Sequence, residues 1–311
     1  MEFPPEIPWD LSILPAGSER TATIKDNPKT WTQQYPVVGI SAFHVAQCLI
    51  DGMNDQGLSA HGLYMPGGFC VYQDAKGDGS DVAIMDLIAF LLGTCATLDE
   101  VKEAVASITI VGVDPGMGFP PPLHILLYTQ DGAAAIEFHE DGVAFVDNPV
   151  AVGTNAPYLD WHLTNLRNYI GLSAHNPKAV IDGKTMEPLG QGQGVRGLPG
   201  DYTPTARFVR AFANTRLAKP ASDSDDAERL TLRILNTFEI VPGIIREPNP
   251  AGGEWDEITD WVTVANLTGS RYSYRNHTDP SPYVVDFASA DLSKERIVPL
   301  AGPRAFSPAQ I

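Results

Sequence analysis

The feature that most constrains the fold of this chain is a set of short apolar runs separated by turn residues. Residues 37–40 and 45–50 are apolar runs whose length and composition suit buried β-strands. The sequence Asn-Asp-Gln-Gly at 54–57 is a turn signal, and the run at 58–64 follows it. We therefore predict a β-hairpin whose two strands are the runs at 45–50 and 58–64.

Helical patterns follow these runs. Residues 82–92 are apolar on nearly every side and are long enough for a buried helix. Thr97 and Glu100 form a capping box, in which the threonine hydroxyl accepts from a first-turn N–H group and the glutamate reaches back to the cap. Further amphipathic patterns predict helices at 160–170, 205–217 and 227–238.

Strand patterns return later in the chain, whereas the beginning has none. We predict strands at 124–129, 134–139, 142–147, 261–267, 272–275 and 283–288. Residues 1–36 are rich in proline and polar residues, which predicts an irregular arm. Strands and helices alternate without a repeat or a low-complexity tract. One domain over residues 1–311, with two stacked sheets and helices outside them, suits this order.

The charge balance excludes some classes of partner. Lys and Arg number 21 and Asp and Glu number 38, which gives a net charge of −17. Such a surface repels phosphate backbones and anionic lipids, so neither nucleic acid nor a membrane is expected as a partner. The sequence contains no run of about 18 apolar residues, so no membrane-spanning helix is predicted. The start of the chain lacks the pattern of a signal peptide, and a soluble bacterial protein of either periplasm or cytoplasm remains open.

The cysteines and histidines predict neither a disulfide framework nor a metal site. Cys48, Cys70 and Cys95 are few, odd in number and without CxxC spacing, so each is expected to be a small buried apolar residue. The seven histidines show no HxxxH or HExxH spacing. We therefore expect no metal, and no other cofactor is implied.

Four stretches, in this order along the chain, resemble the choloylglycine hydrolase and penicillin V acylase family. They are Asp-Gly-Met-Asn-Asp-Gln-Gly-Leu at 51–58, Thr-Asn-Ala-Pro at 154–157 with Trp-His-Leu-Thr-Asn-Leu-Arg-Asn-Tyr at 161–169, Gly-Leu-Pro-Gly-Asp-Tyr-Thr-Pro-Thr-Ala-Arg-Phe at 197–208, and Trp-Val-Thr-Val-Ala-Asn-Leu at 261–267 with Arg-Tyr-Ser-Tyr-Arg at 271–275. The resemblance implies an α+β protein with a four-layer αββα sandwich of two stacked, mainly antiparallel sheets, the N-terminal-nucleophile hydrolase fold.

The resemblance also implies hydrolysis of linear amides by a cysteine that processing exposes as the first residue. A thiol attacks an amide carbonyl only as the thiolate, which needs a base and a cationic neighbour. The α-amino group of a terminal cysteine lies beside its thiol and titrates at about 7.7–8.0, which suits proton transfer to the leaving amine. Nucleophile, base and oxyanion donors all come from the protein.

Four catalytic candidates follow from the resemblance. Glu2 takes the place of the acid that holds the amine of the cysteine, and Asn155 matches the asparagine whose amide donates to the oxyanion. Arg207 matches the arginine that stabilises the thiolate, and Tyr64 lies where relatives place another oxyanion or pocket residue of varying type. Without the resemblance, an asparagine before Ala-Pro is typical of a turn, and an arginine on a helix is typical of a solvated face.

None of the three cysteines in the chain has a free α-amine, so none matches the nucleophile that the resemblance implies. We expect that cysteine upstream of Met1, about one hairpin before it, and we expect the chain as printed to be inactive alone. The alternative is a catalytically silent binding relative. The coding DNA upstream of Met1 distinguishes the two, and the retained Asn155 and Arg207 favour the enzyme.

The expected substrate is a small acyl amide that joins an apolar acyl group to a polar amine. Penicillin V is the first expectation, and conjugated bile salts, N-acyl homoserine lactones and ceramide-type amides are alternatives. Phe69, Tyr72 and Phe119 belong to aromatic and proline-rich loops that could line an apolar acyl pocket. His61 is a further substrate-binding candidate, although a structural histidine is the simpler interpretation. Relatives also imply a homotetramer.

Overall fold

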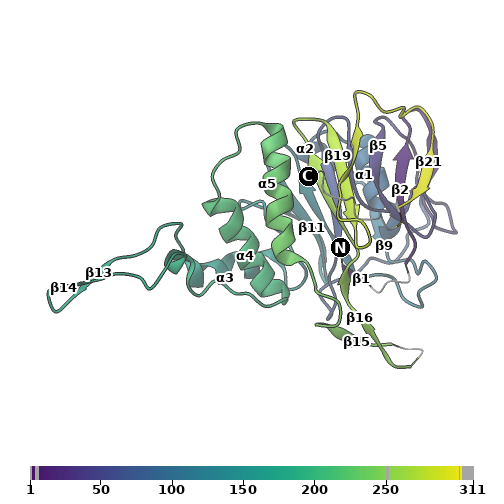
Figure 1. Ribbon diagram of the computed structural model, residues 1–311. Helices are drawn as coiled ribbons and strands as arrows, with labels where there is room; N and C mark the ends of the chain where they lie inside the picture. Colours follow the sequence, from purple (N-terminus) through teal and green to yellow (C-terminus); the bar gives the residue numbers. More distant parts are fainter. Residues whose placement is uncertain (1, 4–6, 250–251, 301, 303–311) are drawn as a thin grey trace. The chain divides into compact units, whose positions relative to one another are not determined.

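The computed structural model describes residues 2–3, 7–249, 252–300 and 302 (Figure 1). The chain forms two compact units. Residues 1–151 and 239–311 form the first unit, and residues 152–238 form the second. The second unit is therefore an insertion in the sequence of the first. The expectation of one domain over residues 1–311 stays a prediction.

The first unit contains an eight-stranded sheet in which every pair of neighbours is antiparallel. In order across the sheet its strands are β12 (Gly142–Asp147), β11 (Ala133–His139), β10 (Leu123–Tyr128), β7 (Ser59–Tyr64), β6 (Leu49–Asn54), β5 (Val37–Ala42), β2 (Trp9–Leu14) and β21 (Arg296–Pro299). The predicted hairpin is confirmed in its turn and its second strand, whereas its first strand is β6 rather than the run at 45–50. The turn at 54–57 joins β6 and β7, and Asn54 Oδ1 accepts there from the N–H groups of Gln56 and Leu58 at 3.1 Å.

Two expectations for the first fifty residues are wrong. Residues 1–36 are not an irregular arm, because β2 lies inside the large sheet between β5 and β21, and β3 (Glu19–Thr21) pairs with β4 (Thr30–Thr32). The apolar run at 45–50 is not one strand. Phe43 and His44 adopt left-handed backbone conformations, with φ of 61° and 57°, and the chain turns before β6 begins.

A second sheet is stacked on the large one. It contains β18 (Trp261–Asn266), β19 (Arg271–Asn276) and β20 (Tyr283–Asp286), all antiparallel. The Tyr272 hydroxyl on β19 donates to Asp51 Oδ1 on β6 at 2.5 Å, and the rings of Trp9 and Trp261 pack edge to face at 5.5 Å. The strands predicted at 261–267, 272–275 and 283–288 are thus present, with small shifts of their ends.

Helix α1 (Leu87–Thr94) covers the opposite face of the large sheet. Side chains alternate across a strand, so the neighbours of Asp51 on β6 point away from β19. A Cβ atom added to Gly52 would lie 3.2 Å from Cδ1 of Leu92 on α1, so glycine allows the helix to approach the strand closely. The apolar run at 82–92 is shared among β8 (Asp81–Ala83), a 3₁₀ turn η1 (Ile84–Asp86) and α1, rather than one helix.

The capping box is confirmed at the start of α2 (Leu98–Ala106). The Thr97 side chain accepts from the N–H group of Glu100 at 3.2 Å, and the Glu100 carboxylate accepts from the N–H group of Thr97 at 3.3 Å. After α2, β9 (Thr109–Val111) pairs in parallel with β8. Two small antiparallel pairs complete the first unit, β1 (Glu2–Phe3) with β17 (Ile258–Thr259) and β15 (Arg246–Pro248) with β16 (Glu254–Asp256).

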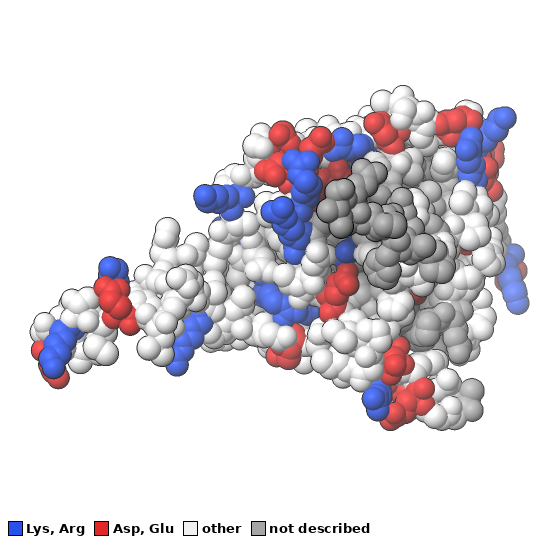
Figure 2. All heavy atoms as spheres, viewed as in Figure 1, with Lys and Arg blue, Asp and Glu red and all other residues white. Residues whose placement is uncertain are grey.

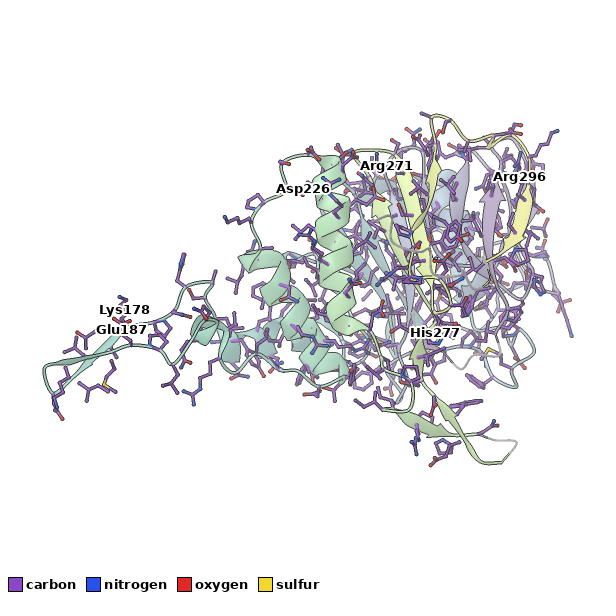
Figure 3. The ribbon with its side chains drawn as sticks, in the orientation of Figure 1. Lys178, Glu187, Asp226, Arg271, His277 and Arg296 are labelled. Atoms are coloured by element: carbon purple, nitrogen blue, oxygen red, sulfur yellow. The ribbon has the colours of Figure 1, made fainter. Side chains whose placement is uncertain are left out.

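The second unit is mainly helical. Its elements are α3 (Leu159–Asn165) with η2 (Leu166–Tyr169), the hairpin β13 (Ala179–Ile181) and β14 (Lys184–Met186), η3 (Gln193–Val195), α4 (Pro204–Leu217), and α5 (Ser224–Leu235) with η4 (Asn236–Phe238). Thr203 caps α4 and Asp223 caps α5 through their side chains. Lys178 and Glu187 lie together at the base of the exposed hairpin, 3.3 Å apart (Figure 3).

Within the described residues, no helix combines the length and the apolar character that crossing a membrane requires. On the face of the molecule in Figure 2, basic side chains lie next to acidic ones. Arg246, for example, is 3.7 Å from Asp256 and 4.0 Å from Glu254 in the β15–β16 hairpin. Exposed pairs of this kind contribute little to stability.

Candidate active site

Asn155 and Arg207 meet in the second unit, although 52 positions separate them in the sequence. Asn155 lies in the loop before α3, and Arg207 lies at the start of α4. Nη2 of Arg207 donates to Oδ1 of Asn155 at 2.6 Å. The structure therefore brings together two of the four residues that the sequence nominates as catalytic.

The start of α4 is fixed by its sequence, and this fixes the position of Arg207. The Thr203 hydroxyl accepts from the N–H group of Ala206 at 3.3 Å, and Pro204 occupies the first helical position, where no N–H group is needed. The next residue on the helix, Phe208, is fully buried. Because Phe208 anchors one face of the first turns, Arg207 is held on the side where Asn155 lies.

His162 holds the loop that carries Asn155. Its Nε2 lies 3.1 Å from the carbonyl oxygen of Asn155, and its ring stacks on Phe208 with 4.6 Å between centroids and 11° between planes. Burial lowers the pKa of His162, so the ring is neutral at ordinary pH. A carbonyl oxygen only accepts, so Nε2 carries the hydrogen of the neutral ring. Asn155 is thus fixed through its backbone by His162 and through its side chain by Arg207.

This arrangement orients the amide of Asn155. A guanidinium group only donates, so the amide atom of Asn155 that faces Arg207 is the oxygen Oδ1. The donor Nδ2 is the other branch of the same planar amide group. A donor held in advance by a rigid neighbour is what a developing oxyanion requires. The pair therefore combines an oriented N–H donor with a permanent positive charge.

Arg210, one turn after Arg207, holds the loop before α4. Its Nη1 donates to the carbonyl oxygens of Pro199 and Asp201 at 3.0 Å each, and its guanidinium lies 4.7 Å from the ring centre of Phe238. Burial, followed by the positive charge of Arg207, lowers the pKa of Arg210. Arg210 is not among the residues predicted from the sequence, although the Arg-x-x-Arg spacing places both residues on one helix face.

Tyr64 and Phe119 lie at the same end of strands β7 and β10 in the first unit. Tyr64 is the last residue of β7 and pairs with Leu123, the first residue of β10. The loop of residues 112–122, which carries Phe119, leads directly into Leu123. Tyr64 is 37% exposed and Phe119 is 45% exposed, whereas Phe69 is half-buried. The catalytic role of Tyr64 and the pocket role of Phe69 and Phe119 stay predictions.

Tyr72 is engaged by the protein itself. Its hydroxyl donates to the carbonyl oxygen of Pro121 at 2.7 Å and accepts from the N–H group of Leu123 at 2.8 Å, while its ring packs on Phe138 at 5.0 Å. Burial raises the pKa of Tyr72 far above its ordinary value, so the hydroxyl remains protonated. Its contribution to a pocket would be to hold the loop that carries Phe119.

His61 belongs to a network between the stacked sheets. Its Nδ1 lies 2.6 Å from Asp51 Oδ2, its Nε2 lies 3.1 Å from Ser59 Oγ, and its ring packs on Tyr128. Burial alone would raise the pKa of Asp51, but the charge and hydrogen bond of His61, with the hydrogen bond from Tyr272, outweigh it and lower the pKa. Both ring nitrogens of His61 have protein partners, which favours the structural interpretation over substrate binding.

Glu2 is placed only through its backbone. It belongs to β1, where it is paired with Thr259 of β17. The side chain of Glu2 lies outside what the structure describes. Glu2 and Tyr64 are part of the first unit, whereas Asn155 and Arg207 are part of the second.

The cysteines do not resemble nucleophiles. Burial raises the pKa of Cys48 to about 12 and the pKa values of Cys70 and Cys95 to about 11. Cys48 and Cys95 are buried, and Cys70 is half-buried with its Sγ 3.4 Å from the carbonyl oxygen of Leu123. A thiol with such a pKa is almost entirely protonated near neutral pH, so these three cysteines are packing residues.

Within the described ranges, no group of three His, Cys, Asp or Glu side chains is arranged to hold a metal ion. Four polar residues that the sequence did not nominate each form a hydrogen bond to another polar group: His162, Arg210, Asp51 and Tyr272. Asp51 and Tyr272 each lie inside a stretch that carries the family resemblance. Both are polar residues at buried positions of a strand, and this pattern is the sequence signal for Asp51 and Tyr272.

Solved structures of other proteins share this fold. A variant of conjugated bile acid hydrolase from Clostridium perfringens superposes with a TM-score of 0.81 at 24% identity, over 97% of this chain and 92% of its own. Penicillin V acylase from Agrobacterium tumefaciens superposes with a TM-score of 0.73 at 24% identity, over 94% of this chain and 83% of its own. The stacked antiparallel sheets with outer helices therefore define an N-terminal-nucleophile hydrolase fold, as the resemblance implies.

Sequence comparison narrows this class. The bile salt hydrolase/transferase of Clostridium perfringens is 29% identical over 302 residues, which are 94% of this chain and 89% of that protein. The bile salt hydrolase/transferase of Lactiplantibacillus plantarum is 34% identical over 247 residues, which are 78% and 74%. The sequence model of the choloylglycine hydrolase family of linear amide C–N hydrolases matches residues 1–299. The chain belongs to this family.

Proposed function

We propose that this protein hydrolyses the amide bond of conjugated bile acids. The observation that carries the proposal is the pairing of Arg207 with Asn155, found in a chain whose relatives at 29% and 34% identity are named as bile salt hydrolases. The pair provides an oriented amide donor next to a fixed positive charge. Bile acid conjugates have the expected chemistry, because they join a large apolar acyl group to a small polar amine.

The proposed reaction proceeds through a thioester. A cysteine thiolate forms a bond to the carbonyl carbon, and the carbonyl oxygen becomes an oxyanion. The C–N bond then breaks, and the amine leaves with a proton from the protonated α-amino group. Water then attacks the thioester and gives a proton to the α-amino group, the C–S bond breaks, the acid leaves, and the cysteine is restored. Each proton moves between groups that titrate near neutral pH.

Asn155, Arg207 and Glu2 have separate roles in this proposal. Nδ2 of Asn155 donates to the oxyanion, a contribution of about 3–4 kcal/mol to lowering the barrier. The charge of Arg207 favours the thiolate over the thiol and keeps the amide of Asn155 in orientation. The carboxylate of Glu2 would hold the α-amino group of the cysteine. Tyr64 would supply a second oxyanion or pocket contact.

A substrate panel tests the proposal. The protein expressed from its own gene is assayed with a glycine-conjugated bile acid, penicillin V and an N-acyl homoserine lactone, and the released amine is measured. We expect the highest kcat/KM for the bile acid conjugate. A higher value for penicillin V would support the other specificity that the family contains. A folded protein that hydrolyses none of the three would be the silent relative.

The identity of the nucleophile and the assembly are tested separately. Mass spectrometry of the N-terminus of the active protein should find cysteine as its first residue, because burial raises the pKa values of the three internal thiols to about 11–12. Light scattering should give about four times the 33.5 kDa chain mass if the protein is a homotetramer. A mass near that of one chain would contradict this assembly.

A further inference from the structure

The side chain of Tyr72 contacts the chain at both ends of the loop of residues 112–122. At its end, the Tyr72 hydroxyl donates to the carbonyl oxygen of Pro121 and accepts from the N–H group of Leu123. At its start, a Cβ atom on Gly112 would lie 2.5 Å from Cδ2 of Tyr72, so only glycine allows the chain to pass this close to the ring. One half-buried tyrosine therefore contacts both ends of the loop.

The middle of the loop is organised by Asp114. Its carboxylate accepts from the N–H groups of Gly116 at 2.8 Å, Met117 at 2.7 Å and Gly118 at 3.0 Å. Gly116 and Gly118 have φ of 110° and 88°, conformations that glycine adopts without strain. These hydrogen bonds, that from Gly116 first, lower the pKa of Asp114, so the group that gathers the loop is a carboxylate at ordinary pH.

The residue that follows these hydrogen bonds is apolar and exposed. Phe119 is 45% exposed and lies four residues before Leu123, the β10 residue that pairs with Tyr64. An ordered loop thus carries an exposed phenylalanine four residues before the strand residue that pairs with Tyr64. Pre-organisation of this kind increases affinity because the ordering cost is paid on folding rather than on binding.

We propose that Asp114 is a positioning residue for the acyl part of the substrate, because it fixes the loop that presents Phe119 beside the strand end of Tyr64. The inference rests on the proposed function and adds a specificity determinant to it. Asp114 does not touch the substrate. It acts through Phe119, which contacts an apolar acyl group, and Tyr72 supports the same loop from its two ends.

The experiment compares Asp114→Ala and Asp114→Asn with a matched control. Asp78 is also exposed and also accepts from a backbone N–H group two residues later, that of Ser80 at 2.9 Å, so Asp78→Ala removes a similar side-chain-to-backbone contact elsewhere. We expect Asp114→Ala to raise KM for the bile acid conjugate about tenfold with little change in kcat. Asp114→Asn keeps one acceptor oxygen, so it should raise KM less than Asp114→Ala does. Asp78→Ala should have the KM of the unmodified protein.

Two further measurements make the inference independent of catalysis. Free bile acid is titrated into the protein with Phe119→Trp as a fluorescent reporter, with and without Asp114→Ala. Binding that weakens about tenfold without Asp114 supports the inference even if no amide is hydrolysed, in which case only the proposed function fails. In the hydrolysis assay, Phe119→Ala should remove the effect of Asp114→Ala on KM. The inference would be overturned if Asp114→Ala left KM unchanged. It would also be overturned if the effects of Asp114→Ala and Phe119→Ala on KM were independent of each other.

Discussion

Nη2 of Arg207 donates to Oδ1 of Asn155 at 2.6 Å, and this hydrogen bond joins helix α4 to the loop before α3. Arg207 lies in the first turn of α4, which begins at Pro204, and Asn155 lies in a loop. The contact is possible because Thr203 fixes where the helix begins and because His162 fixes the carbonyl group of the loop. An oriented amide donor results, and its contribution to the reaction can be measured.

Removal of the Asn155 side chain should lower the rate of the chemical step. We expect Asn155→Ala to reduce kcat by about 10²–10³, with a smaller change in KM, because in the proposed mechanism the donor acts on the oxyanion rather than on the bound substrate. Steady-state kinetics with the bile acid conjugate checks this. Asn168→Ala, at an exposed asparagine of the same unit, is the control. Equal losses in both variants would exclude a role for Asn155.

Asn155 and Arg207 should not act independently. In a double-mutant cycle with Asn155→Ala and Arg207→Ala, the combined loss in activation free energy should differ from the sum of the single losses by about 0.5–3 kcal/mol. The physical reason is that Arg207 orients the amide whose effect is measured. kcat/KM for the four proteins gives the coupling. Strict additivity would mean that the 2.6 Å contact has no functional consequence.

His162 should matter for stability and for rate. His162→Phe preserves the stacking on Phe208 but leaves the Asn155 carbonyl group without this donor, which should cost about 1–3 kcal/mol in free energy of unfolding. kcat should also fall because the loop is no longer fixed. Urea denaturation and steady-state kinetics measure the two effects. His175→Phe, at an exposed histidine, should change stability by less than about 0.5 kcal/mol.

Asp51 should make stability depend on acid pH. Although burial opposes it, the charge and hydrogen bond of His61 and the hydrogen bond from Tyr272 lower the pKa of Asp51 in the folded state. Its contribution is therefore complete above the unfolded pKa of about 3.9 and is lost as the pH falls through the lower folded value. Asp51→Asn should be less stable by about 3 kcal/mol at neutral pH and should lose less on acidification.

Urea denaturation at neutral pH and at stepwise lower pH measures this dependence. Asp55→Asn, at the exposed aspartate of the same hairpin, should follow the curve of the unmodified protein. If Asp51→Asn also follows that curve, the network of His61, Asp51 and Tyr272 does not couple folding to this titration.

Local sequence patterns determined several elements with little need of the rest of the molecule. The turn at 54–57 forms because Asn54 accepts from two N–H groups of the turn itself, and α2 begins where Thr97 and Glu100 cap it reciprocally. Each depends on residues a few positions apart, so the sequence alone predicts them. The family resemblance, which depends on residue order, likewise gave the fold and nominated Asn155 and Arg207.

Only the tertiary structure decided the rest. Residues 1–36 offer few strand signals, yet β2 is a strand because β5 and β21 satisfy its backbone groups on both sides. The run at 45–50 is apolar enough for a strand, but the chain turns at Phe43 and His44 and β6 begins only at Leu49. Ala46 and Cys48 are buried although they lie outside the strand, because burial stabilises an apolar residue in a turn as well as in a strand. The 2.6 Å contact of Arg207 with Asn155 joins residues 52 positions apart, and no local pattern encodes such a contact. The hydrogen bonds of His162 and Arg210 span only 7 and 11 positions, but they join a helix to an irregular loop whose course no periodic pattern predicts.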